Sequence, residues 1–450
     1  MEPDKPDRAS DVEGYKTLAE SVFRSESEIM ARDFLNRNPE RRKKPRTRQR
    51  SLVPTPPRLD DYEQLVGKSE LEQLRSLARG LRGRKVRMVG SAHLETDAGA
   101  VAGRIVPLLG ELQIAADWQM MEVTGDFLHL ARKLRLAGTK LTKQDQEIFL
   151  QHRKQRHTQG DEDIVVLHDP EALVFARTKA REEQRWVWRC HVNISDFHPE
   201  TWAFLKPYVE EKDAAIFSAQ AFASPVAIPQ YLFYPCLDPL ADRNKQLEAS
   251  YIRQVCDRFG IDRSRPILAH VSQFDQPRDL HGIIQAYRLA KKYVDCQLII
   301  AGRVPEGDPE TSGVLAVTLE AAAGDADILV RGLPAISDRE ISAIQSASAI
   351  VVQNSQRASS SRTVTEALWK GKPVIGAAVG GIPNQIIHKI TGLLVHSVEG
   401  CAYQIRYLLT HQSLAEQLGR NGREHVKENF LITSDLKRWL VLFQILLRNK

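Results

Sequence analysis

Cysteine is scarce in this chain of 450 residues, which has five cysteines and no Cys-x-x-Cys pair. An odd number of scattered cysteines argues against a disulfide framework and against a zinc cluster, and it favours a reducing compartment. Long apolar runs are absent too, because none approaches the roughly 20 residues that span a bilayer. The first residues, MEPDKPDRAS, lack the apolar core of a signal peptide. We therefore expect a cytoplasmic protein with no membrane span.

Two common catalytic signatures are missing as well. The sequence contains no His-Glu-x-x-His motif and no Walker loop. Those motifs place two zinc ligands on one helix face and cradle nucleotide phosphates, respectively. Metal-dependent hydrolysis and nucleoside triphosphate hydrolysis therefore have little support, and no metal site is expected.

Positive charge is concentrated near the N-terminus. The formal net charge is +6, and residues 36–50 (NRNPERRKKPRTRQR) hold most of the excess. Such a block cannot form a core, which predicts a solvated arm. Loose contact with nucleic acid, anionic lipid or an acidic partner stays open for it. The segment lacks the interleaved aromatic residues of a base-stacking surface, so nucleic-acid binding is not expected.

Beyond the prolines at positions 54, 56 and 57, helical stretches alternate with short apolar runs, beginning with helical spacing over residues 59–81. The runs cover residues 86–89, 164–167, 186–192 and 214–217, and then 266–271, 297–301, 328–333, 349–352 and 374–377. Apolar runs in which polar residues do not alternate, separated by helices, are typical of parallel sheets covered on both faces. The sequence therefore predicts an α/β protein with two doubly wound, Rossmann-like domains.

The domain boundaries follow from this pattern. We expect a basic tail over residues 1–58, a first domain over 59–245, a second over 246–433, and a final helix over 434–450. Residues 234–244 (YPCLDPLADRN) are rich in Pro and Asp and are predicted to link the domains. Ligands in such sheets bind beyond the carboxyl ends of the strands, so the predicted site lies in a cleft between the domains.

Residues 346–386 are the most informative stretch (SASAIVVQNSQRASSSRTVTEALWKGKPVIGAAVGGIPNQI). A buried-strand run leads into a Ser-rich loop and then into a helix that carries Glu366. A second strand opens into a turn at Gly380 and Gly381. This succession builds a nucleotide site at the carboxyl edge of a parallel sheet.

Six segments occur in family order and spacing: HDPE (168–171), WVWRCHVNIS (186–195), LDPLADRN (237–244), EALWKGKPVIG (366–376), VGGIPNQI (379–386) and HVKENFLIT (425–433). From about Leu59 to the C-terminus the chain resembles the trehalose synthases, which are retaining GT-B glycosyltransferases of family 4. The resemblance implies two facing domains and a last helix that crosses back to the first. It also implies glucose as acceptor, a nucleoside diphosphate glucose as donor and no separate cofactor. A homodimer is left open.

The resemblance also assigns roles to residues. It places His191 and Asp169 at the reacting centre, and His168 and Arg189 at the acceptor. The donor would contact Arg278, Gln273, Glu366, Gly99, Gly380 and Gly381. In relatives the positions of Gln273 and Arg278 hold the diphosphate, and that of Glu366 accepts hydrogen bonds from the nucleotide ribose.

Several positions depart from the family pattern. Gln273 replaces an arginine, Ala358 a glutamate, and Glu171 the usual glutamine. Serines replace glycine, phenylalanine and glycine at 359–361, and Asp97 and Ala98 precede Gly99 in place of a run of three glycines. Losing one hydrogen bond to a charged phosphate weakens binding by about 10- to 100-fold.

Three hypotheses remain open on these residues. The first is a retaining transferase that joins glucose to glucose, with reversible phosphorolysis of trehalose as a related reaction. The second is a catalytically impaired homologue that binds a sugar, a nucleotide or a protein partner. The third is a transferase whose Ser-rich loop accepts another donor.

Overall fold

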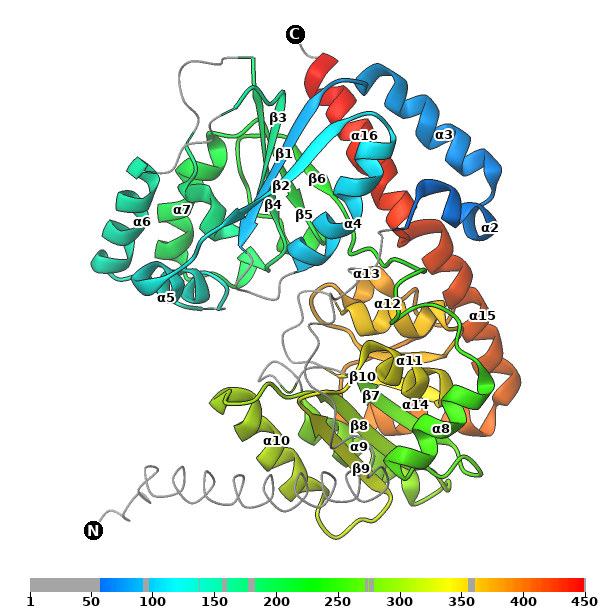
Figure 1. Cartoon of the computed structure of the whole chain (residues 1–450). Helices are drawn as coiled ribbons and strands as arrows, with labels where there is room; N and C mark the ends of the chain where they lie inside the picture. The colour runs from blue at the N-terminus through cyan, green and yellow to red at the C-terminus, as the bar shows by residue number, and fades with distance from the viewer. Residues whose placement is uncertain are drawn as a thin grey trace, which may run out of the picture.

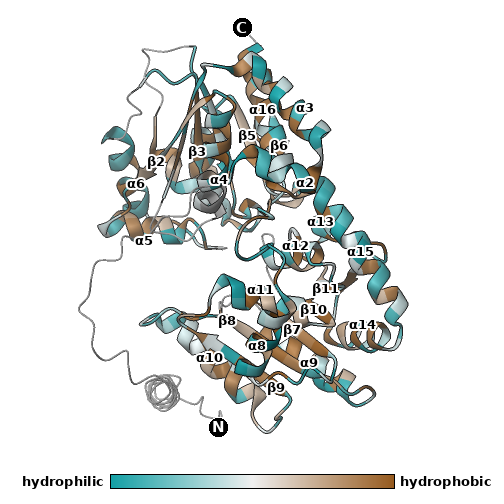
Figure 2. Ribbon diagram, turned by 45° about the vertical axis from the view of Figure 1, so that its right-hand side comes forward, coloured by the Kyte–Doolittle hydropathy of each residue, from teal (hydrophilic) through white to brown (hydrophobic). Residues whose placement is uncertain are grey.

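The computed structural model describes residues 57–91, 97–136, 138–155, 160–176, 183–271, 274, 279–354 and 361–448. They form two lobes, each built on a parallel sheet of six strands with helices on both faces (Figure 1). Strands are mostly brown in Figure 2, whereas the helices covering them carry teal on their outer sides. The predicted α/β class with two doubly wound domains is confirmed. No helix in the described part of the chain is long and apolar enough to cross a membrane.

The first lobe has the strand order β2-β1-β3-β4-β5-β6. Its strands are β1 (Lys85–Ser91), β2 (Ala115–Met121), β3 (Ile164–His168), β4 (Arg185–Cys190), β5 (Ala214–Phe217) and β6 (Gln230–Leu232). Its helices are α2 (Glu63–Val66), α3 (Lys68–Ala78), α4 (Asp97–Glu111), α5 (Gly125–Lys133), α6 (Lys143–Gln155) and α7 (Pro199–Glu210). The inner strands β3 and β5 are buried along their whole length, as expected for apolar runs without alternating polar residues.

The second lobe has the order β12-β11-β10-β7-β8-β9. Its strands are β7 (Ile267–Val271), β8 (Gln297–Arg303), β9 (Ile328–Leu333), β10 (Ile350–Gln353), β11 (Val374–Ala377) and β12 (Leu393–Val395). Its helices are α8 (Ala249–Phe259), α9 (Leu280–Lys291), α10 (Pro309–Ala322), α11 (Asp338–Ala347), α12 (Arg362–Trp369), α13 (Ile382–Gln385), α14 (Val398–Thr410) and α15 (Gln412–Asn429).

Three strands and one helix break were not predicted. β2 and the short strands β6 and β12 are outer strands of their sheets. β2 is largely uncovered, so its residues AADWQMM do not read as an apolar run. The helical stretch over residues 59–81 is interrupted at Gly67, which adopts φ 85° between α2 and α3. Hydrophobic spacing continues through such a turn and does not reveal it.

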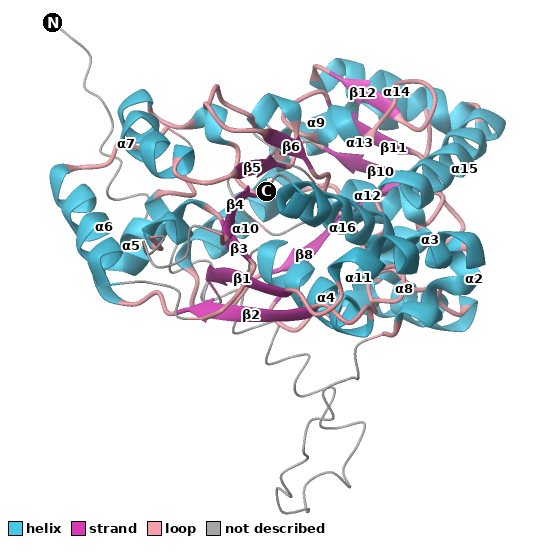
Figure 3. Ribbon diagram, turned by 90° about the horizontal axis from the view of Figure 1, so that it is seen from above, coloured by secondary structure: helices cyan, strands magenta, loops and turns pink. Residues whose placement is uncertain are grey.

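Two chain segments cross between the lobes, and they are hydrogen-bonded to each other. The Leu237 amide donates to the Phe430 carbonyl at 2.8 Å, and the Ile432 amide donates to the Leu237 carbonyl at 2.9 Å. The final helix α16 (Ile432–Arg448) then packs against α3 and α4 of the first lobe (Figures 1 and 3). Its buried Leu436 and Trp439 belong to that lobe's core.

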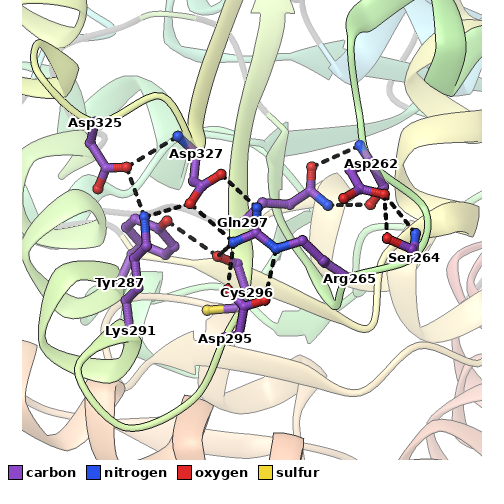
Figure 4. Close-up of polar contacts among 10 residues, drawn as sticks. All are labelled: Asp262, Ser264, Arg265, Tyr287, Lys291, Asp295, Cys296, Gln297, Asp325 and Asp327. Carbon is purple, nitrogen blue, oxygen red and sulfur yellow. Dashed lines mark hydrogen bonds and ion pairs between the residues drawn. The ribbon is translucent and has the colours of Figure 1, made fainter.

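An ionic cluster joins the amino ends of three strands in the second lobe (Figure 4). Arg265, just before β7, pairs with Asp327, just before β9, at 2.6 Å, and also with Asp295, just before β8. Lys291 of α9 pairs with Asp327 at 2.7 Å and with Asp325 at 2.9 Å. These charges hold the starting ends of the strands together, at the opposite end of the sheet from the predicted site.

Candidate active site between the lobes

A cavity of about 260 Å3 lies where the lobes, the linker and α16 meet. The first lobe contributes Arg189 and His191, and the second contributes Asp338, Arg362 and Glu366. The linker adds Tyr234 to Asp238, Ala241, Arg243 and Asn244, and α16 adds Asp435 and Trp439. The structure thus brings the predicted acceptor-side residues Arg189 and His191 and the predicted ribose residue Glu366 to one space.

Two histidines meet at the carboxyl ends of neighbouring strands. His168 ends β3, His191 follows β4, and His168 Nδ1 lies 3.1 Å from His191 Nε2. Burial lowers the pKa of both rings well below the ordinary value, and the positive charges of Arg189 and Arg135 lower that of His191 further. Both imidazoles are therefore neutral at pH 7, so one ring donates to the other. His191 borders the cavity, whereas His168 lies behind it.

Asp169 is fully buried, and its carboxylate is engaged within the protein. Oδ1 accepts the His191 amide at 2.9 Å, and Oδ2 accepts Arg135 Nη2 at 2.9 Å. Its backbone has φ 69°, a conformation that an aspartate adopts only where its surroundings hold it. Asp169 therefore fixes the backbone from which the His191 ring projects.

Arg135 was missed by the sequence reasoning. It lies just beyond α5, far in sequence from the strand ends it serves, and it ion-pairs with both Asp169 and Glu171. No motif surrounds it, so only the tertiary structure reveals its position. Glu171 is fully buried, and burial raises its pKa to about 7 even though Arg135 opposes the shift.

Arg189 reaches under α16 towards the linker. Its Nη2 donates to the Phe233 carbonyl at 2.7 Å, and its charge faces the buried carboxyl group of Asp435. Arg189 Nη1 and Asn244 Oδ1 are buried and have no hydrogen-bond partner within the described part of the chain. Both residues line the cavity. Because protein covers these two atoms, they are unsatisfied polar groups within the wall of the cavity and do not face its interior.

Glu366 lies on α12 and is 4% exposed. Its Oε2 accepts Arg243 Nε from the linker at 2.9 Å. Although burial raises the pKa of this carboxyl group, the charges of Arg243, Lys370 and Arg362 together hold it below the ordinary value. Glu366 is therefore an ionised hydrogen-bond acceptor on the wall of the cavity.

The remaining predicted residues fall at loops and helix ends. Gly99 is in the first turn of α4 and is exposed. Gly380, with φ 57°, and Gly381 form the turn between β11 and α13. Gln273, Arg278 and Ala358 lie outside the described residues. Over the described ranges, no group of three or more His, Cys, Asp or Glu side chains is arranged to hold a metal ion.

Comparison with known proteins identifies relatives of the whole folded part. One family profile, described as trehalose synthase, N-terminal domain, matches residues 98–224, and another, glycosyl transferases group 1, matches residues 255–425. The trehalose synthase of Thermococcus litoralis is 34% identical over 397 residues, covering 86% of this chain and 96% of the relative. That of Rubrobacter xylanophilus is 32% identical over 404 residues, covering 86% and 97%.

Solved structures share the fold at lower identity. Sucrose-phosphate synthase from Thermosynechococcus elongatus superposes with a TM-score of 0.63 at 16% identity, covering 82% of this chain and 100% of that one. Anabaena Alr3699/HepE in complex with UDP-glucose gives 0.58 at 13%, covering 80% and 99%. With two facing parallel sheets and these full-length relatives, the chain belongs to the trehalose synthase family of glycosyltransferases and has the GT-B fold.

Proposed function

We propose that this glycosyltransferase transfers glucose from a nucleoside diphosphate glucose to free glucose, with retention, to give an α,α-linked disaccharide. The observation that carries the proposal is the single cavity bordered by His191 from one lobe and the ionised Glu366 from the other. Full-length relatives that are named trehalose synthase support the choice of donor and acceptor class.

The cavity supplies groups suited to sugar hydroxyls. Arg189 and Asn244 line it with a guanidinium and an amide group, and the neutral His191 ring donates or accepts a hydrogen bond at the reacting hydroxyl. Glu366 accepts the ribose hydroxyls of the donor. Asp169 acts through His191, whose amide it holds.

The chemical step needs no enzyme nucleophile in this proposal. A bond forms between the acceptor oxygen and C1 of the donor glucose, while the bond between C1 and the diphosphate oxygen breaks on the same face. The acceptor proton passes to the departing diphosphate. Positive charge and hydrogen-bond donors stabilise the charge that develops on that leaving group.

Arg278 and Gln273 are the proposed diphosphate residues. Arginine binds phosphate in a two-pronged manner, whereas glutamine donates a hydrogen bond without charge. With one cation replaced, we expect donor binding about 10- to 100-fold weaker than with an arginine at position 273. Gln273→Arg should therefore lower the KM for the donor without an equal change in kcat.

The test is an incubation of the purified full chain with glucose and ADP-, UDP- or GDP-glucose, followed by measurement of released nucleoside diphosphate. Release that depends on glucose and falls in Glu366→Ala supports the proposal. Folded protein that binds a nucleoside diphosphate but releases none would favour the impaired, ligand-binding homologue, which the replacements at positions 273 and 358 also favour. Folded protein that neither binds nor turns over any donor would refute the proposal.

A further inference from the structure

Arg243 of the linker contacts two helices of the second lobe that border the cavity. Its Nε donates to Glu366 Oε2 at 2.9 Å, and its Nη1 donates to Asp338 Oδ1 at 3.1 Å. Asp338 is the first residue of α11, and Glu366 lies in the middle of α12. One guanidinium group therefore bridges two helices of the second lobe from outside that lobe's sheet.

The backbone of the linker is anchored to the same helix. Lys370 Nζ donates to the Arg243 carbonyl at 2.9 Å, and the Trp369 indole donates to the Asn244 carbonyl at 3.1 Å. Because α12 holds both the main chain and the side chain of Arg243, the guanidinium group has a fixed position relative to Glu366. A flexible surface arginine would give no such orientation.

The contact also explains why a buried carboxyl group stays charged. Glu366 is almost fully buried, and desolvation alone would raise its pKa. Arg243 is the strongest of the three cations that oppose this, followed by Lys370 and Arg362. An ionised carboxylate has about four acceptor positions, of which the hydrogen bond from Arg243 uses one.

We propose that Arg243 is a positioning residue for the donor, which holds the Glu366 carboxylate ionised and oriented so that it accepts the hydroxyl groups of the nucleotide ribose. The inference rests on the proposed function for the ligand, and it adds a residue from the interlobe linker to the recognition of that ligand. It also predicts that the chain distinguishes ribonucleotides from deoxygenated ones through this pair.

The first experiment compares binding of a nucleoside diphosphate with its 2′,3′-dideoxy analogue by calorimetry at pH 6, 7 and 8. We use whichever of ADP, UDP or GDP the wild-type chain binds. Wild type should prefer the ribonucleotide by about 10- to 100-fold, as expected for a hydrogen bond to a charged group. In Arg243→Gln the preference should shrink most at pH 6, where Glu366 takes up a proton. Arg243→Lys, which keeps the charge, should restore a preference that does not vary with pH.

Arg339→Gln is the matched control, because Arg339 neighbours Asp338 but packs on Tyr251 outside the cavity. It should leave the preference unchanged. If Arg243→Gln weakens both nucleotides equally at every pH, the residue is merely structural and the inference is overturned, while nucleotide binding by wild type still supports the proposed function.

A second experiment measures the interaction between Arg243 and Glu366 in the absence of any ligand. Thermal unfolding of wild type, Arg243→Gln, Glu366→Gln and the double variant is followed from pH 5 to pH 8. Without Arg243, the pKa of Glu366 rises, so stability should fall as pH increases through the new value. The double variant should lose this pH dependence. If the stability losses of the two single variants add up to that of the double variant at every pH, the two side chains do not interact and the pairing is refuted. If Arg243 and Glu366 are coupled but the chain binds no nucleotide, both their role in ribose binding and the proposed function are refuted.

Discussion

Glu171 is a buried carboxyl group in a cluster whose charges do not balance. Arg135 faces two carboxyl groups, Asp169 and Glu171, so full ionisation would leave one uncompensated negative charge in the interior. Burial accordingly raises the pKa of Glu171 to about 7. Asp169 of this cluster accepts the backbone amide of His191. The protonation state of the cluster therefore affects how His191 is held at the proposed site.

Replacing Glu171 with glutamine should stabilise the protein at alkaline pH. Between the ordinary pKa of about 4.5 and the raised value of about 7, the native chain retains a proton that the unfolded chain has lost, so stability falls as pH rises. Glu171→Gln removes that loss and leaves one cation facing one anion. We expect a gain on the order of 1–3 kcal/mol at pH 8 and none near pH 5.

Thermal unfolding across pH 5 to 8 measures this effect. Glu200→Gln is the matched control, because Glu200 is exposed on α7 and pairs with Lys140 on the surface. Its pKa is lowered by that pair, so the control should not change the slope over this range. A Glu171→Gln variant less stable than wild type at pH 8 would show that Arg135 needs both carboxylates.

Among individual residues, the polar side chains at the ends of strands could be predicted from the sequence, whereas ion-pair partners distant in the sequence could not. His168 and His191 follow two buried strands, and carboxyl ends of neighbouring parallel strands meet at one edge. Their 3.1 Å contact fits that expectation. Arg135 and Arg243 carry no local signal for their ion pairs, because their partners lie 34 and 123 residues away.

At the scale of the element, α15 shows why a helix keeps glycines in its interior. A Cβ atom added at Gly419 would lie 2.1 Å from the Gly371 carbonyl oxygen, and one added at Gly422 would lie 2.7 Å from Leu368 Cδ2. Glycine costs a helix about 0.5–1 kcal/mol relative to alanine. Here that cost is offset by the close approach of α15 to the end of α12, the helix that carries Glu366.

Gly419→Ala should therefore destabilise the chain although alanine favours helix. The clash is with backbone, which cannot move aside as a side chain can, and overpacking of this kind costs about 1–3 kcal/mol. Gly313→Ala is the control, since Gly313 lies exposed inside α10 with nothing within 4 Å of the added atom, and it should gain about 0.5–1 kcal/mol. Urea unfolding measures both, and a neutral Gly419→Ala would contradict the close packing.

Elements with buried apolar runs were predicted well, and those without were not. β3, β5, β7 and β11 match expected runs because both faces of these strands are covered. The outer strand β2 alternates and is partly exposed, so tertiary pairing with β1, rather than composition, makes it a strand.

At the scale of the whole molecule, the final helix belongs to the lobe that begins the chain. α16 contributes Leu436, Trp439, Leu440 and Phe443 to the core of the first lobe. That lobe therefore reaches its full core only when the last residues of the chain are in place. The apolar spacing of these residues indicated a helix, whereas the lobe it covers was expected only from the family resemblance.

Leu436→Ala should destabilise the first lobe by about 2–5 kcal/mol, because the side chain is completely buried and its removal leaves a cavity. Ile445→Ala on the same helix is the matched control, as Ile445 is 37% exposed and should lose much less. Hydrogen exchange locates the effect, which should appear in the amides of β1 and β3. Faster exchange confined to the second lobe would contradict this assignment of α16.

The proposed function requires that the chain joins two glucose units at the cavity between the lobes. The most direct measurement is a 13C NMR spectrum of the full chain incubated with [1-13C]glucose and unlabelled nucleoside diphosphate glucose. We expect a labelled anomeric signal of an α,α-linked disaccharide, which should be lost in Glu366→Ala. Labelled glucose that stays unchanged, with folded protein that binds the nucleoside diphosphate, would contradict it.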